Sequence, residues 1–156
     1  MDTVLDFIRR EIRLRLELPD NEVLLESAAV LTDKSDIRGL TISVVNVHIS
    51  AYQSQGLGRP ELLDSIELML LFSFRFSRYE TSLLNLYRTM RLFFVRPTYT
   101  TSEAHPDNPF PAHIDKLFFT FMPLEFDVLK NVWGMLGGTC LPSALYSLRI
   151  VRKQEH

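Results

Sequence analysis

Cysteines, glycine-rich segments and metal-binding motifs are scarce or missing in this sequence, and each absence excludes a class of chemistry. Cys140 is the one cysteine among 156 residues, so the chain can form neither an internal disulfide nor a paired-cysteine zinc site. The sequence contains no glycine-rich phosphate loop and no HExxH zinc motif. We therefore expect no bound metal, no cofactor and no enzymatic activity.

Long hydrophobic runs and an excess of one charge are also missing. The most apolar stretch, residues 66–76, is interrupted by Glu67 and Arg75 and is too short to span a bilayer. Charged residues appear from Asp2 onward, unlike the start of a secretory signal. The net charge of -2 argues against nucleic acid as the main partner, because phosphate binding needs a basic face. We expect a cytoplasmic protein without direct membrane insertion.

The basic residues are dominated by arginine, with 13 Arg among the 17 basic side chains. Arginine is enriched at protein interfaces, where lysine is depleted, although a codon preference explains the bias equally well. Four arginines gather on the first predicted helix: Arg9, Arg10, Arg13 and Arg15. They are either candidates for contact with an acidic partner surface or the solvated face of an amphipathic helix.

Hydrophobic spacing predicts a single domain over residues 1–156 with eight regular elements. The predicted helices cover 3–17, 78–95 and 124–136, and the predicted strands cover 22–31, 40–51, 66–76, 114–122 and 143–152. Residues 53–64 are predicted to form a loop. The order αβββαβαβ indicates an α+β fold, with one mixed sheet of about five strands flanked by three helices.

The strand at 66–76 is apolar on both faces, which is typical of a central strand covered twice. Alternate residues from Ile66 to Phe76 are apolar, and Met69 and Leu71 make the middle of the other face apolar as well. We expect the core to contain these large side chains: Phe72, Phe74, Tyr87, Phe118, Trp133 and Tyr146.

Residues 97–113 contain four prolines and little periodicity, which is typical of a binding loop or a mobile arm. We therefore add residues of this segment to the candidate partner interface: Tyr99, His105, Asp107, Asn108 and Phe110. Because residues 101–110 have little patterned apolar content, their deletion is expected to leave the fold intact.

One sparse constellation could carry chemistry. His113 and Asp115 are two residues apart at the start of a predicted strand, so their side chains point the same way. Together with Cys140 they would have to converge in a pocket for a small enzyme or ligand-binding domain. The simpler interpretation is an exposed histidine at a strand end and a buried cysteine.

Four segments of the chain carry a resemblance to a known family. They are 66–76 leading into Tyr79-Glu80-Thr81; Leu92-Phe93-Phe94 with Pro97 and Thr98-Tyr99-Thr100; 114–124 leading to Trp133-Gly134-Met135-Leu136-Gly137-Gly138; and Leu141-Pro142-Ser143-Ala144-Leu145-Tyr146. In this order they resemble the N-terminal domain of tail-terminator (cap) proteins of extracellular contractile injection systems, of the virulence-cassette and antifeeding-prophage type.

This resemblance implies a structural role and specific partners. The chain would form a homo-oligomeric ring, a hexamer, on the distal end of the inner tube and sheath of the particle, where it ends polymerisation and anchors the sheath. A baseplate or tube adaptor of the same particle is the alternative within this class. Many family members continue well beyond this domain, and we expect residues 97–113 to supply the sheath contact of those extensions.

Overall fold

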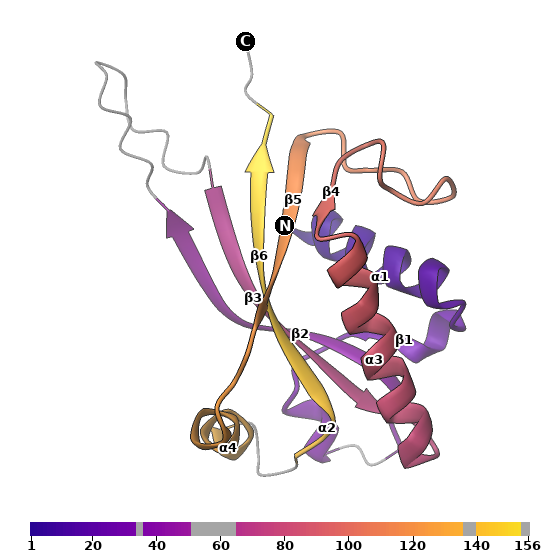
Figure 1. Cartoon of the computed structure of the whole chain (residues 1–156), viewed down its shortest axis with the longest axis vertical. Helices are drawn as coiled ribbons and strands as arrows, with labels where there is room; N and C mark the ends of the chain where they lie inside the picture. Colours follow the sequence, from indigo (N-terminus) through magenta and orange to yellow (C-terminus); the bar gives the residue numbers. More distant parts are fainter. Residues whose placement is uncertain (34–35, 51–64, 136–139, 154–156) are drawn as a thin grey trace.

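The centre of the molecule is one mixed β-sheet (Figure 1), in a computed structural model that describes residues 1–33, 36–50, 65–135 and 140–153. The strands lie in the order β1-β2-β3-β6-β5-β4. Their bounds are β1 (Val23–Leu25), β2 (Gly39–Ser50), β3 (Ser65–Arg75), β4 (Thr98–Tyr99), β5 (Ile114–Met122) and β6 (Ser143–Arg152). β1 is parallel to β2, and the other neighbouring strands are antiparallel. The predicted α+β fold with a mixed sheet is confirmed, and the short β1 and β4 bring the strand number to six.

β3 lies in the middle of the sheet and is covered on both faces, as its sequence predicts. Leu68, Leu70 and Phe72 point to one face and are fully buried. Leu71 points to the other face and is equally buried in a second cluster. Since both faces of β3 are apolar, each face needs its own layer of helices.

The first face is covered by α1 (Asp2–Leu16) and α3 (Tyr79–Val95), which lie on the same side of the sheet (Figure 1). α1 buries the predicted stripe of Val4, Ile8, Ile12 and Leu16 against the sheet. The helix ends at Glu17, whose backbone is left-handed and whose N–H donates to the carbonyls of the preceding turn. None of the helices in the described ranges is long and apolar enough to cross a membrane.

The second face is covered by α2 (Val30–Asp33) and α4 (Phe126–Met135), and α4 lies at the lower end of the sheet in Figure 1. Trp133 of α4 packs with Leu71 and Leu145 in this cluster. Its indole Nε1 donates a hydrogen bond to Ser143 Oγ at 3.3 Å. The smaller cluster thus depends on one aromatic side chain.

The predicted strand at 22–31 is wrong beyond Leu25, because α2 follows instead of further strand. Ala28 and Leu31 are three residues apart, so a helical turn brings both onto the second face of the sheet. β2 can begin close beside the 3-10 turn Asp20–Glu22 because residue 39 is glycine. Its φ is +123°, and a Cβ there would meet the Glu22 carbonyl oxygen at 2.3 Å. The predicted loop at 53–64 lies outside the described residues.

Two of the expected core residues lie elsewhere. Tyr87 is 62% exposed, because α3 turns Ser82, Asn85 and Thr89 inward together with Phe93, and Tyr87 lies on the outer side of the helix. These small polar side chains are satisfied locally: Asn85 Nδ2 donates to the Thr81 carbonyl, and Thr89 Oγ1 donates to the Asn85 carbonyl. Local hydrogen bonding therefore lets a polar stripe face the sheet and leaves an apolar stripe outside.

Phe118 is only half-buried and lies on the opposite face of β5 from the main core. An irregularity in pairing between Ile114 and Lys116 shifts the alternation, so that Leu117 and Phe119 point inward. The Arg149 guanidinium lies over the Phe118 ring, with 5.0 Å between its central carbon and the ring centre. The other expected core residues, Phe72, Phe74, Trp133 and Tyr146, are all buried.

The burial of Trp133 generates a stability prediction. We expect Trp133→Ala to lower the free energy of unfolding by about 3–5 kcal/mol, because it removes the largest side chain of the second cluster and leaves a cavity. Phe126→Ala on the same helix is the control, since Phe126 is 77% exposed and its loss should change stability by under about 0.5 kcal/mol. Urea unfolding of both variants measures the difference, and equal midpoints would contradict the assignment of Trp133 as the anchor of this cluster.

Candidate assembly surfaces

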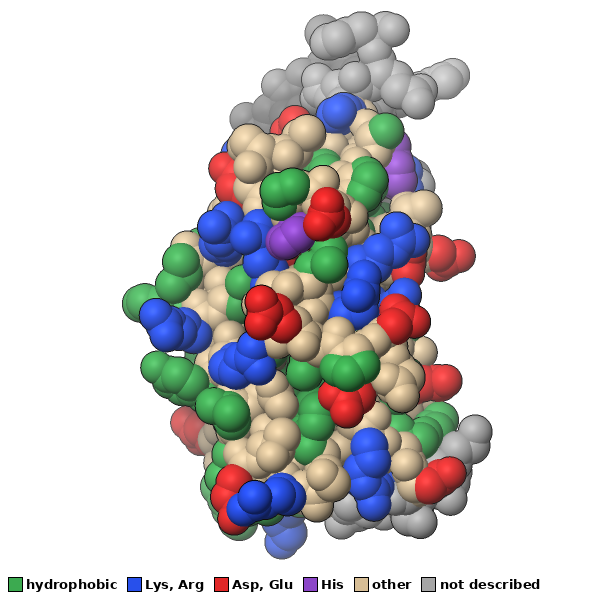
Figure 2. Space-filling model, turned by 90° about the vertical axis from the view of Figure 1, so that its right-hand side faces the viewer, with side chains coloured by type: hydrophobic (Ala, Val, Ile, Leu, Met, Phe, Trp, Pro, Cys, Tyr) green, Lys and Arg blue, Asp and Glu red, His purple; other side chains and the backbone are tan. Residues whose placement is uncertain are grey.

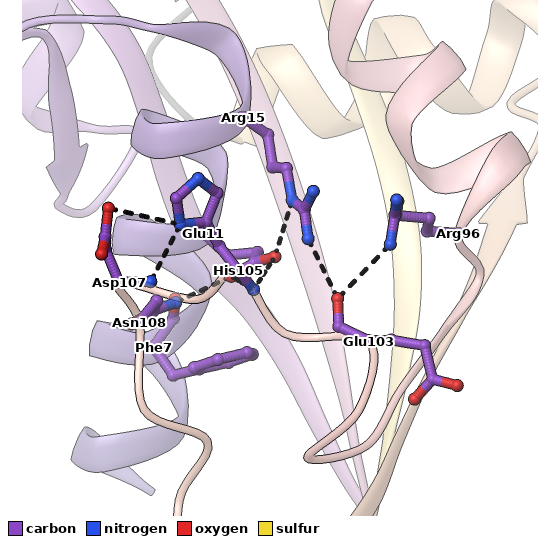
Figure 3. A network of polar contacts seen from close by, with 8 residues as sticks. All are labelled: Phe7, Glu11, Arg15, Arg96, Glu103, His105, Asp107 and Asn108. Carbon is purple, nitrogen blue, oxygen red and sulfur yellow. Dashed lines mark hydrogen bonds and ion pairs between the residues drawn. The ribbon is translucent and has the colours of Figure 1, made fainter.

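A buried carboxylate on α1 holds the proline-rich segment after β4 (Figure 3). The His105 N–H donates to Glu11 Oε1 at 3.0 Å and to Oε2 at 3.1 Å. Asn108 Nδ2 donates to Glu11 Oε2 at 2.9 Å and to the Phe7 carbonyl at 3.0 Å. Arg15 Nε donates to the same carboxylate at 3.0 Å. Glu11 therefore accepts three different donors, which offsets the desolvation of its charge.

Further contacts extend this attachment along the segment. Arg15 Nη2 donates to the Glu103 carbonyl at 3.0 Å, and Arg96 reaches the same oxygen (Figure 3). Phe110 packs edge-on against Phe7, with 5.2 Å between ring centres. The segment is thus docked on α1 rather than projecting as an arm. These contacts argue against the expectation that residues 101–110 can be deleted without harm to the fold.

Two of the residues proposed for the partner interface from this segment are not accessible. Tyr99 and Asn108 are each 1% exposed, Tyr99 beside Phe7 and Asn108 beneath α1. The structure corrects their assignment, because both side chains are used inside the chain. Asp107 is exposed, whereas His105 and Phe110 are half-buried.

The four arginines of α1 are all paired with acids of the same chain. Arg9 contacts Asp6 and Asp20, Arg10 contacts Asp6, Arg13 contacts Asp20, and Arg15 contacts Glu11. The hydrogen bond from Arg9 and its charge hold the pKa of Asp20 below the ordinary value. Figure 2 shows the result on this side of the molecule, where blue and red side chains alternate with no field of one sign. The pairing favours the solvated-face interpretation of these arginines.

The residues considered for catalysis do not converge. His113 precedes β5, and its carbonyl accepts the Lys153 N–H just beyond the end of β6. Cys140 precedes the start of β6 and is exposed. Since β6 has ten residues, the two side chains are separated by roughly 30 Å of strand. Among the described residues no group of three His, Cys, Asp or Glu side chains could hold a metal ion.

The buried tyrosines offer no acid–base group either. Burial raises the pKa of the Tyr146 hydroxyl to about 12. Burial, with the Glu11 charge adding to it, also raises the pKa of Tyr99 well above its ordinary value. Both phenols therefore remain protonated at neutral pH.

An apolar groove opens between α3 and β5, with a volume of about 550 Å³. Phe119, Phe121 and Tyr146 line it from the sheet, and the helix contributes Tyr87 and Phe94. Phe94 is 87% exposed, and Arg91 is the cation that lines the groove. Such a concentration of exposed aromatic side chains is typical of a protein-binding surface.

A second apolar surface runs along the outer half of β2. It consists of Val44, Val45, Val47 and Ile49, each more than a third exposed. β1 pairs only with Leu40–Ile42, so this half of β2 has no neighbouring strand on its outer side among the described residues. An apolar strand with an open edge is a template for pairing with another chain.

Sequence reasoning missed both surfaces, although it contained a signal for each. Tyr87 of α3 was expected in the core, but the same helix also carries Ser82, Asn85 and Thr89 at helical spacing. For β2, the run of β-branched residues lies on both faces, which exceeds what one helix layer can cover.

The burial of Glu11 generates a second stability prediction. We expect Glu11→Ala to cost about 3–5 kcal/mol, because it leaves Arg15 and two other buried donors without their acceptor. Asp6→Ala on the same helix is the control, since its ion pairs with Arg9 and Arg10 are partly exposed and worth under about 1 kcal/mol. Urea unfolding compares the two variants, and proteolysis within residues 101–110 should accelerate in the Glu11 variant alone. Equal stability of the two variants would show that the carboxylate does not hold the segment.

Two solved structures share this fold across nearly the whole chain. One is the sheath/tube terminator of the PVC extracellular contractile injection system in its extended state, with a TM-score of 0.63 and 14% identity over 99% of this chain. The other is the tube-terminating cap of the anti-feeding prophage, with a TM-score of 0.62 and 11% identity over 98% of this chain. The chain spans 57% and 55% of the length of these two proteins.

The family assignment rests on the sequence match. No curated protein matches the chain significantly. Residues 3–156, from the first turn of α1 to the end of the sequence, match one family along their whole length. The chain therefore belongs to the Pvc16 N-terminal domain family.

Proposed function

We propose that this protein is a structural cap subunit, which forms a ring on the end of the tube and sheath of a contractile injection system. The observation that carries the proposal is the shared fold. At least 98% of the chain superimposes on two proteins that are themselves a sheath/tube terminator and a tube-terminating cap. Family membership over residues 3–156 supports the same role.

The surfaces of the chain agree with a part that works by assembly. The α3/β5 groove and the outer half of β2 expose apolar side chains that a neighbouring protein would cover. A closed ring uses head-to-tail contacts, which need two different surfaces on each subunit. The partners in this proposal are further copies of the chain, in a hexamer, and the tube and sheath proteins of the particle.

The rival enzyme interpretation has lost its geometric basis, because His113 and Cys140 lie at opposite ends of β6. We therefore expect His113→Ala, Asp115→Ala and Cys140→Ser to leave folding, assembly and particle activity at the level of the unmodified protein. Circular dichroism and a particle infection or toxicity assay test each variant. Loss of particle activity by a folded His113 or Asp115 variant would restore the enzyme interpretation.

The cap role makes a prediction about particles that lack this protein. A terminator blocks addition of the next layer of tube and sheath, so its deletion should give particles with irregular lengths or unstable sheaths. Electron microscopy of the deletion strain measures the length distribution, and complementation with the unmodified gene is the control. Particles of normal length with an intact distal cap would contradict the proposal.

The location of the protein separates the cap from its closest alternative, a baseplate or tube adaptor of the same particle. Immunogold labelling of the tagged chain should mark one tip only, at the end distal to the baseplate, and at low copy number beside sheath and tube. Labelling at the opposite end would move the assignment to the baseplate.

A further inference from the structure

As far as the structure describes the chain, the sheet has an open edge on each side, and the two edges are different. On one side β1 covers only Leu40–Ile42, which leaves residues 44–50 of β2 without an outer neighbour among the described strands. On the other side β4 pairs only with Leu117 and Phe118, and the Pro97 carbonyl accepts the Phe119 N–H at 2.7 Å. In the part of the chain that the structure describes, residues 120–122 of β5 have no neighbour on this edge.

The apolar side chains at both edges lie on the same face of the sheet. Val44, Val47 and Ile49 of β2 lie opposite Leu70, Leu68 and Ile66 of β3, which face α1 and α3. Directly opposite residues of an antiparallel pair share a face, so the three β2 side chains also point to the helix side. Phe119 and Phe121 point to that side from β5.

The backbone groups at the two edges are also directed outward. In β2 the Ile42 carbonyl accepts the Glu26 N–H at the outer edge, and the Val47 N–H donates to the side chain of Asn46 at 2.9 Å. The Val47 N–H is therefore not committed to β3. In β5 the Phe119 N–H points to the β4 edge of the sheet. Backbone groups alternate along a strand, so the Phe121 N–H, two residues further on, points to the same edge.

The directions of the strands allow a second copy of the chain to pair at the edge of the sheet. The four long strands β2, β3, β6 and β5 are neighbours in that order and alternate in direction. Consequently β2 is antiparallel to β5 within one chain. A second copy displaced sideways along the sheet, with its helices on the same side, would present its β2 antiparallel to β5 of the first.

We propose that neighbouring copies join head to tail through these edges. The outer half of β2 from one copy pairs with residues 120–122 of β5 in the next, and Val44, Val47 and Ile49 enter the groove beneath α3. The proposal rests on the proposed ring and names its subunit contact. Because the two edges differ, each copy keeps one free edge until the ring closes.

The exposed area agrees with a specific contact. Tyr87, Phe94 and Phe121 are 62%, 87% and 45% exposed, which corresponds to roughly 400 Å² if each aromatic residue presents about 200 Å² in full. A stable interface buries about 800 Å² on each partner. Three residues of the groove thus supply about half of the required area on one side, before the backbone edge is counted.

Cysteine cross-linking tests the head-to-tail geometry. In a Cys140→Ser background, Val47→Cys and Phe121→Cys are introduced singly and together, and the full chain is treated with a short bis-maleimide that tolerates a small shift in register. The treatment is applied to the concentrated protein and to isolated particles. We expect the double variant to give a ladder of species larger than a dimer on denaturing gels, whereas each single variant gives dimers at most.

Charge substitutions provide an independent readout of the same contact. Val47→Lys and Phe121→Lys should each weaken self-association by roughly 10- to 100-fold in sedimentation velocity, because each places an ammonium group in the apolar groove. The matched controls are His48→Lys, one residue away from Val47 on the opposite, exposed face of β2, and Leu84→Lys, at an exposed position of α3 that does not line the groove. These controls should associate like the unmodified chain.

The outcomes separate this contact from the function. If the double-cysteine variant gives no species above a dimer in both preparations, or if the controls weaken association as much as the groove variants, the edge contact is wrong. Capped particles of normal length in that case would leave the cap role standing. Particles without this protein at the distal tip would instead remove the cap role, whatever the cross-links show.

Discussion

The architecture follows from one constraint, the apolar character of β3 on both of its faces. Leu68, Leu70 and Phe72 need cover on one side, and Leu71 needs it on the other. If either face were left open to water, several of these side chains would be exposed. The burial of each one stabilises the fold by about 1.5–3 kcal/mol. The helices are therefore divided between the two faces, with α1 and α3 on one and α2 and α4 on the other. Within the described residues, the four α-helices, one of them a single turn, do not reach the ends of a sheet with long strands. The outer half of β2 and the end of β5 are therefore uncovered in that part of the chain.

The elements with strong periodicity could be predicted from the sequence, and those set by tertiary contacts could not. The stripe of α1 and the alternation of β3 are local patterns, and both have the predicted faces. The region after Leu25 reads as strand by composition, but the packing of Ala28 and Leu31 against Trp133 decides for a helical turn. For β5, an irregularity in pairing with β6 changes which phenylalanine faces the core. No local pattern encodes such a shift.

The candidate site was harder to predict than the fold, for a related reason. Charged and polar residues were taken as the partner-binding surface, whereas the structure uses many of them internally. Glu11 is the clearest example: its buried carboxylate accepts from Arg15 on the same helix and from His105 and Asn108 of a distant segment. Conversely, Tyr87 of α3 was expected in the core, although Asn85 and Thr89 occupy the inner face of the helix. The type of a residue alone does not determine whether its side of the helix packs against the sheet or faces solvent.

The hydrogen bond between the Asn46 side chain and the Val47 N–H affects how readily the outer edge of β2 pairs with another chain. The Asn46 side-chain oxygen is held next to the Val47 N–H at a high effective concentration. It therefore competes for this N–H with any carbonyl that approaches from another molecule. Pairing of this edge with another chain must first displace the internal acceptor, which disfavours loose pairing with unrelated strands. One small side chain thus protects the backbone of an apolar edge strand from non-specific pairing.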